Sequence, residues 1–105
     1  MVRMQVWLKK KDEMSAEQFR DYWATRHAPI ARDGYAGLRG YELNLVTRVI
    51  GDAPAPYDGL AVLSWDTRED FSADMKSDAA RLATEDLANF TSASGVLFVD
   101  TELVK

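Results

Sequence analysis

Apolar and polar residues alternate at the start of the chain, in residues 2–10 (VRMQVWLKK). A period of two residues is typical of a β-strand with one buried face. One face of this strand would carry the apolar side chains Val2, Met4, Val6 and Leu8. Runs rich in apolar and β-branched residues predict three more strands, at 41–50 (YELNLVTRVI), 57–65 (YDGLAVLSW) and 96–104 (VLFVDTELV).

The apolar residues after the first strand change to helical spacing. Ser15 and Gln18 form a Ser-x-x-Gln capping box, which starts a helix by satisfying its first backbone N–H groups. Phe19 and Trp23 follow four residues apart and would lie on one side of this helix. The sequence therefore predicts a first amphipathic helix directly after the first strand.

Pro29 is expected to limit this helix, because proline lacks a backbone N–H and pushes the preceding residue, Ala28, into extended backbone. The regular helix is predicted to end near Arg26 or His27. A turn or a second short helix would then continue to Asp33.

Residues that favour turns, bulges and helix caps mark the boundaries of the other predicted elements. The segments rich in glycine, serine and proline predict loops or turns at 34–40, 51–56 and 91–95. Gly59, inside a predicted strand, indicates a bulge or a close approach by another group. Thr67 would cap a second helix that continues to about Phe90, with a break at 76–80 (KSDAA).

The order strand–helix–strand–strand–helix–strand predicts one α+β domain over residues 1–105. This is the ferredoxin-like β-α-β-β-α-β sandwich, with an antiparallel four-stranded sheet and both helices on one face. The other face would expose apolar side chains, and exposed apolar area of that extent marks an interface. The last strand would present one of two sets there, either Val96, Phe98 and Val104 or Leu97, Val99 and Leu103. We therefore expect a two-fold homodimer through the open sheet face.

Composition narrows the classes of partner. Thirteen basic and 17 acidic residues give a net charge of −4, which argues against nucleic-acid binding. The chain has no cysteine, so disulfides and thiolate chemistry are excluded. No apolar run approaches the roughly 18 residues of a membrane span, and the first residues lack a signal-peptide pattern. We expect no membrane partner and a cytoplasmic location.

His27 is the only histidine, and it is the leading candidate for chemistry. The sequence lacks the common nucleotide-binding, serine-hydrolase and zinc-protease motifs, and one histidine cannot form a multi-histidine metal site, so we predict no metal and no cofactor. At 100° per residue, His27 lies about 80° around the helix from Phe19, at the edge of the apolar stripe. An imidazole there could exchange a proton near neutral pH, or it could simply cap the helix end.

Aromatic residues near His27 complete the predicted site. Tyr22 and Tyr41 would offer hydroxyls to a bound ligand, and Trp23 and Trp65 would form apolar walls. Such a pocket suits a small hydrophobic molecule. Packing in the core is the alternative reading of these aromatic side chains.

Residues 15–33 (SAEQFRDYWATRHAPIARD) resemble the first-helix signature of the EthD family, in which a Phe, a Trp and a His-Ala-Pro have the same spacing. GLRGY, YDGLAVLSW and TEDLANF add supporting matches over nearly the whole chain. The resemblance implies a dimeric α+β barrel with a pocket between the sheet and the helices of each subunit. That superfamily includes cofactor-free monooxygenases, isomerases, cyclases and dehydratases, and EthD itself accompanies a cytochrome P450 system.

Together these features favour a small cofactor-independent enzyme of isomerase, dehydratase or cyclase type, acting on a hydrophobic, cyclic or aromatic metabolite. His27 would be its general acid or base, with Tyr22 or Tyr41 holding a substrate oxygen. One alternative is cofactor-free oxygenation of an electron-rich aromatic compound. Another is a non-catalytic protein that binds a hydrophobic compound or assists an oxygenase system.

Overall fold

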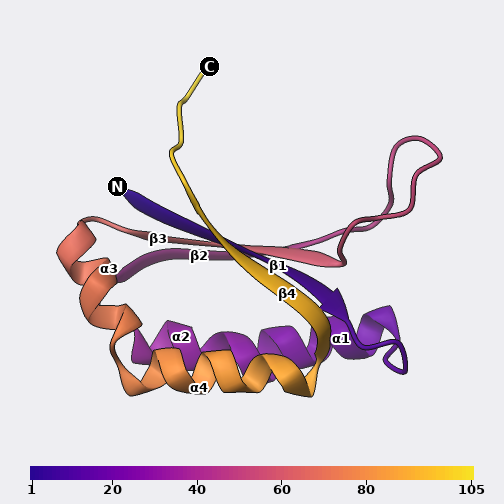
Figure 1. Cartoon of the computed structure of the whole chain (residues 1–105), viewed down its shortest axis with the longest axis horizontal. Coiled ribbons are helices and arrows are strands. Elements are labelled where there is room, and N and C mark those ends of the chain that lie inside the picture. Colours follow the sequence, from indigo (N-terminus) through magenta and orange to yellow (C-terminus); the bar gives the residue numbers. More distant parts are fainter.

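The computed structural model describes residues 1–105 and consists of one sheet layer and one helical layer (Figure 1). The four strands are antiparallel and lie in the order β2-β3-β1-β4. Their bounds are β1 Val2–Lys10, β2 Leu38–Leu45, β3 Gly59–Trp65 and β4 Thr91–Val99. The helical segments are α1 Ala16–Tyr22, the π-helical turn η1 Trp23–His27, α2 Ala28–Gly34, α3 Arg68–Met75, α4 Asp78–Asp86 and the 3₁₀ turn η2 Leu87–Asn89. The predicted ferredoxin-like α+β fold is confirmed.

The helix start at Ser15 and the change to a second short helix after His27 are confirmed, but the predicted extended backbone at Ala28 is wrong. The capping box is complete, since the Ser15 hydroxyl accepts from the Gln18 N–H and the Gln18 side chain accepts from the Ser15 N–H. The chain then stays helical to Gly34, and Ala28 has helical φ and ψ of −56° and −38°. The π-helical turn makes this continuity compatible with proline, because Pro29 falls in the first turn of a new helix, where its missing N–H costs nothing.

Two strands differ from their predicted bounds because pairing, not composition, sets their length. β2 begins inside the glycine-rich segment and ends at Leu45, opposite Gly59 at the start of β3. Val46 N–H then bonds to the Asp58 carbonyl, which closes the base of a long loop. β4 begins at Thr91, in the segment predicted as a loop, and ends at Val99, opposite Arg3 near the start of β1.

The core lies between the sheet and the helices. Its largest fully buried side chains are Trp23, Trp65, Phe19, Phe90 and Leu8. The predicted close approach at Gly59 is present, because a Cβ there would lie 2.5 Å from Cζ3 of Trp23. The first helical segment can therefore sit against β3 only while this position has no side chain.

The strand register assigns the apolar residues of β4 to opposite faces. Val96 pairs with Val6 and Phe98 with Met4, so both face the helical layer. They are nevertheless 52% and 68% exposed, because no helix covers them fully. Leu97, which pairs with Gln5, faces the open side. The loop between β2 and β3 and the residues after Val99 extend away from the helices, toward this open side (Figure 1). No helix is long and apolar enough to cross a membrane.

Candidate functional site

A cavity of about 640 Å³ lies between the helix-facing side of the sheet and the helices α2 and α4. Its size is within the range that binds small organic molecules. The strands supply an apolar floor that includes Met4, Val6, Leu8, Ala61 and Leu63. The cavity opens beside β4, where the exposed Val96 and Phe98 belong to its lining. The site is therefore mainly apolar and reaches the surface at one edge of the sheet.

The antiparallel helices α2 and α4 lie side by side against the cavity (Figure 1), and close contacts join them at both ends. At one end the His27 imidazole bonds to Asp86, the last residue of α4. At the other end Gly34 lies so close to Ala79 that a methyl group at Gly34 would overlap its Cβ. Seven residues separate the two contacts on each chain segment, which corresponds to about 10 Å of helix. The cavity roof thus has a polar end and a tightly packed end.

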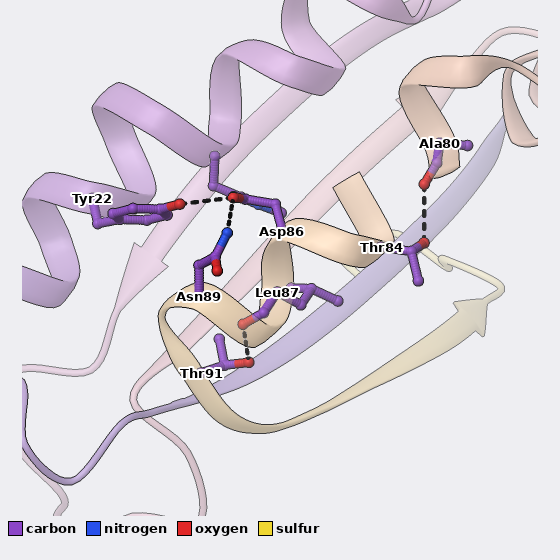
Figure 2. Close-up of polar contacts among 8 residues, drawn as sticks. Tyr22, Ala80, Thr84, Asp86, Leu87, Asn89 and Thr91 are labelled. Carbon is purple, nitrogen blue, oxygen red and sulfur yellow. Dashed lines mark hydrogen bonds and ion pairs between the residues drawn. The ribbon is translucent and has the colours of Figure 1, made fainter. Parts of the chain in front are cut away.

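Asp86 is the centre of a polar network at the first of these ends. Its Oδ1 accepts hydrogen bonds from the Tyr22 hydroxyl at 2.7 Å and from the Asn89 side-chain amide at 2.9 Å. Figure 2 shows both side chains converging on this carboxylate. Its Oδ2 lies 2.8 Å from Nδ1 of His27. One carboxylate therefore joins the first helical segment to α4.

The network sets the protonation state of His27. Burial would raise the pKa of Asp86, but the hydrogen bonds from Tyr22, Asn89 and His27 outweigh this effect and lower the pKa below its ordinary value. Burial lowers the pKa of His27, and the nearby carboxylate opposes that effect only in part. Near neutral pH, a neutral imidazole then faces an ionised carboxylate. Nδ1 therefore carries the single ring proton and donates a hydrogen bond to Asp86.

The second imidazole nitrogen remains available. His27 lines the cavity, and its Nε2 makes no hydrogen bond within the chain. Nε2 is not sealed inside the protein, since the only fully buried side-chain polar atom without a partner is Trp23 Nε1. The alternative role of His27 as a cap for the last helix carbonyls is not what the geometry shows, because its bonded partner is a side chain of α4. Nε2 can therefore act as a proton acceptor toward the cavity.

The other predicted site residues divide into two groups. Trp23 and Tyr41 line the cavity. Tyr22 is not in its lining, and its hydroxyl is already bonded to Asp86. Trp65 is also absent from the lining, because it is fully buried beside Tyr35 and Phe71. In this geometry Tyr22 supports the carboxylate and Trp65 belongs to the core.

Two residues of the site were not predicted from the sequence. Asp86 was not among the predicted site residues, although it is the partner of His27. Its position gave one signal, because a carboxylate at the C-terminal end of a helix is disfavoured by the helix dipole and needs another reason to be there. Tyr35 lines the cavity after α2, and no sequence pattern distinguished it from a core tyrosine.

The acidic residues do not assemble elsewhere into a second centre. No group of three or more His, Asp or Glu side chains is placed so that it could hold a metal ion. Asp74 is buried, but its Oδ2 accepts hydrogen bonds from Trp65 Nε1 at 2.8 Å and from the Gly37 N–H at 3.0 Å. This carboxylate therefore fastens α3 to β3 and to the chain before β2.

Comparison with known proteins agrees with this architecture. An EthD family protein from Bacillus halodurans is 19% identical, with a TM-score of 0.74 over 97% of this chain and 100% of that chain. A protein from Arabidopsis thaliana is 11% identical, with a TM-score of 0.79 over 100% of this chain and 99% of that chain.

A dimeric ferredoxin-like protein of unknown function from Thermobifida fusca is 18% identical, with a TM-score of 0.64 over 95% of this chain and 90% of that chain. At such identities the likeness shows the fold alone. No curated protein matches the chain. The EthD domain matches residues 11–94, which include the first helical segment, the Asp86 network and most of the sheet. The chain therefore belongs to the EthD family.

Proposed function

We propose that the protein is a small enzyme that moves a proton on a hydrophobic carbonyl compound, as an isomerase, dehydratase or cyclase does. The observation that carries this proposal is the His27–Asp86 pair, with the free Nε2 at an apolar cavity. A neutral imidazole oriented by a carboxylate is an effective general base. The apolar lining would strengthen charge interactions formed during reaction once a bound ligand has displaced the water from the cavity.

The proposed step starts with a ligand C–H bond next to a carbonyl group. Nε2 of His27 takes the proton, and the electron pair of the C–H bond forms the enolate, whose negative charge resides on the carbonyl oxygen. Asp86 stabilises the imidazolium that results, through the hydrogen bond at Nδ1. In a conjugated enolate, return of this proton from the imidazolium to the far carbon completes an isomerisation. In an enolate with a β-hydroxyl group, the imidazolium gives the proton to that hydroxyl, which leaves as water, and this completes a dehydration. All of this chemistry uses side chains of the chain itself.

Deuterium exchange tests this function without knowledge of the natural substrate. The protein is incubated in D₂O with apolar ketones, and deuterium next to the carbonyl is measured by NMR. We expect exchange above the buffer rate, and a loss of about 100-fold or more in His27→Gln and in Asp86→Asn. Asp33→Asn is the matched control, because the Asp33 carboxylate contacts only the exposed Arg32. Binding of these ketones without exchange would instead support a non-catalytic binding protein.

We also propose that the protein forms a homodimer through its open sheet face. Trp7, Leu60, Val62 and Leu97 lie on that face and are incompletely buried in one chain. A second copy would cover these side chains, and an isologous contact of this kind closes with two-fold symmetry. The similar Thermobifida fusca protein is described as dimeric, which supports a dimer of this chain.

A further inference from the structure

Two phenol hydroxyls in the cavity have no partner in the chain. Tyr35 and Tyr41 both line the cavity, and neither hydroxyl takes part in a hydrogen bond with another residue. Neither oxygen is sealed inside the protein, since Trp23 Nε1 is the only fully buried side-chain polar atom without a partner. A hydroxyl group in an apolar cavity gains a hydrogen bond when a ligand supplies the acceptor.

The two hydroxyl-bearing residues come from different elements but belong to the same end of the cavity. Tyr35 directly follows α2, and its ring lies 6.2 Å from that of Trp65, at the end of β3. Tyr41 lies on β2 opposite Leu63, two residues before Trp65. The phenol of Tyr35 is near enough to contribute to the raised pKa of Tyr41, after the larger effect of burial. The two tyrosines thus form one polar group, the Tyr35–Tyr41 pair.

The Tyr35–Tyr41 pair is well separated from His27. Tyr35 follows His27 by eight positions of largely helical chain, which corresponds to about 12 Å along the helix axis. On the sheet, Trp23 lies over Gly59, and Leu63, which pairs with Tyr41, is four residues further along β3, about 13 Å away. His27 is one helical turn beyond Trp23 in the same direction, so along β3 it is about 7 Å from the level of Tyr41, and Tyr35 is the more distant member of the pair. Apolar residues such as Ala31 and Ala61 line the space between the two polar ends.

The Asp74 carboxylate favours an uncharged oxygen beside Tyr35, while the charged side chain of Lys76 also lines the cavity. Burial raises the pKa of both phenols, so both hydroxyls keep their protons and act as donors. The carboxylate of Asp74 is close enough to raise the pKa of Tyr35 further, after burial. A negatively charged ligand group would meet this carboxylate, whereas a ketone or ester oxygen accepts from the hydroxyls without that repulsion.

We propose that the cavity takes an elongated apolar compound with a polar group at each end, one proton-donating group at His27 Nε2 and one uncharged carbonyl oxygen held by the Tyr35–Tyr41 pair. This assignment rests on the proposed function for the role of His27, and it adds the length and polarity of the ligand. Tyr35 and Tyr41 then determine specificity, because a ligand without the distant carbonyl leaves both hydroxyls unpaired in the apolar cavity.

Binding of three matched compounds tests the proposal, by titration calorimetry on the full chain. The probe is 4-(4-hydroxyphenyl)butan-2-one, which has a phenol at one end and a ketone at the other. Its relative 4-butylphenol lacks the ketone, and 4-(4-methoxyphenyl)butan-2-one lacks the phenol proton. We expect the probe to bind more tightly than either relative, by about 5-fold or more for each hydrogen bond that is lost.

Single substitutions test the Tyr35–Tyr41 end and the His27 end of the cavity separately. Tyr35→Phe and Tyr41→Phe should each weaken binding of the probe about 5-fold and leave 4-butylphenol unchanged. Tyr57→Phe is the matched control, since Tyr57 lies before β3 and outside the cavity lining. His27→Gln should reduce the advantage of the probe over its methoxy relative while the effect of the tyrosine variants remains.

The proposal is overturned if the wild-type protein binds the probe no more tightly than 4-butylphenol. Equal losses for the probe and 4-butylphenol in the tyrosine variants would overturn it too, because they would show an effect of shape rather than of hydrogen bonding. Failure of the proposed catalytic function gives a different pattern, in which deuterium exchange is absent while the tyrosine variants still discriminate between the probe and 4-butylphenol.

Discussion

Nδ1 of His27 and Oδ2 of Asp86 lie 2.8 Å apart, although 59 residues separate them in the sequence. This contact joins the end of a π-helical turn to the end of α4. It leaves the opposite imidazole nitrogen at an apolar cavity. The catalytic proposal, the pH dependence of stability and the packing of the two helices all depend on it.

Protein stability should fall as pH decreases below about 6.5, and His27 should account for the first part of that fall. The pKa of His27 is lower in the folded protein than its ordinary 6.5, because burial disfavours the charged ring. Between these two pKa values the unfolded chain binds more protons, so the free energy of unfolding decreases as pH falls. Chemical denaturation at several pH values measures this slope.

Two further measurements check that protonation of His27 causes the first loss of stability below pH 6.5. His27→Gln should remove the part of the slope just below pH 6.5 and keep the loss at lower pH, where protonation of Asp86 removes the stabilisation associated with its lowered pKa. Deuterium exchange should rise with pH through an apparent pKa below 6.5, since only the neutral imidazole accepts a proton. A wild-type slope that survives in His27→Gln would contradict the assignment.

Asp86→Asn should destabilise the fold by about 2 kcal/mol, because hydrogen bonds to a charged acceptor at a half-buried position are lost or weakened. Tyr22→Phe removes only one donor and should cost about 1 kcal/mol. Urea denaturation compares both with Asp33→Asn, which breaks an exposed pair with Arg32 and should leave stability almost unchanged. Equal stability of Asp86→Asn and Asp33→Asn would count against a structural network at Asp86.

Gly59→Ala should destabilise the protein by about 1–3 kcal/mol, because the new methyl group would press on the buried Trp23 ring. Trp23→Phe removes the part of the ring that approaches this position. The double variant Gly59→Ala/Trp23→Phe should therefore be more stable than the sum of the two single effects predicts. Simple additivity in urea denaturation would show that the two residues do not compete for the same space.

Asp74→Ala should cost about 3 kcal/mol, because it leaves Trp65 Nε1 and the Gly37 N–H without an acceptor in the core. Asp74→Asn retains one carbonyl oxygen and should cost less. Glu69→Ala, in the exposed first turn of α3, is the control and should change stability by less than about 1 kcal/mol. Near-UV circular dichroism would report the altered surroundings of Trp65, and an unchanged spectrum in Asp74→Ala would contradict this role.

Leu97→Glu should dissociate the proposed dimer, because it places a charge on the open sheet face. Sedimentation velocity measures the outcome as a shift from the mass of two chains to that of one. Leu82→Glu is the matched control, since Leu82 is exposed on α4 in the helical layer. A wild-type protein that sediments as a monomer, or a Leu82→Glu variant that dissociates equally, would refute the assigned interface.

The order of the elements, the ferredoxin-like fold and the start of the first helix could all be predicted from the sequence. These features are local, because alternation, helical spacing and the Ser15–Gln18 box act over a few residues. The end of that helix was not determined locally, since the effect of Pro29 depends on the π-helical turn before it. The ends of β2 and β4 depended in the same way on the strands beside them.

His27 and Tyr41 were identified from residue type and spacing, and the structure places both in the cavity lining. Asp86 and Tyr35 could not be identified in that way, because their roles depend on how α4 and the end of α2 lie against other elements. Only the packing of α4 against α2 decided which acidic residue meets the imidazole and which of its nitrogens remains free. Local patterns specify elements, whereas a site assembled from distant residues exists only once those elements have packed together.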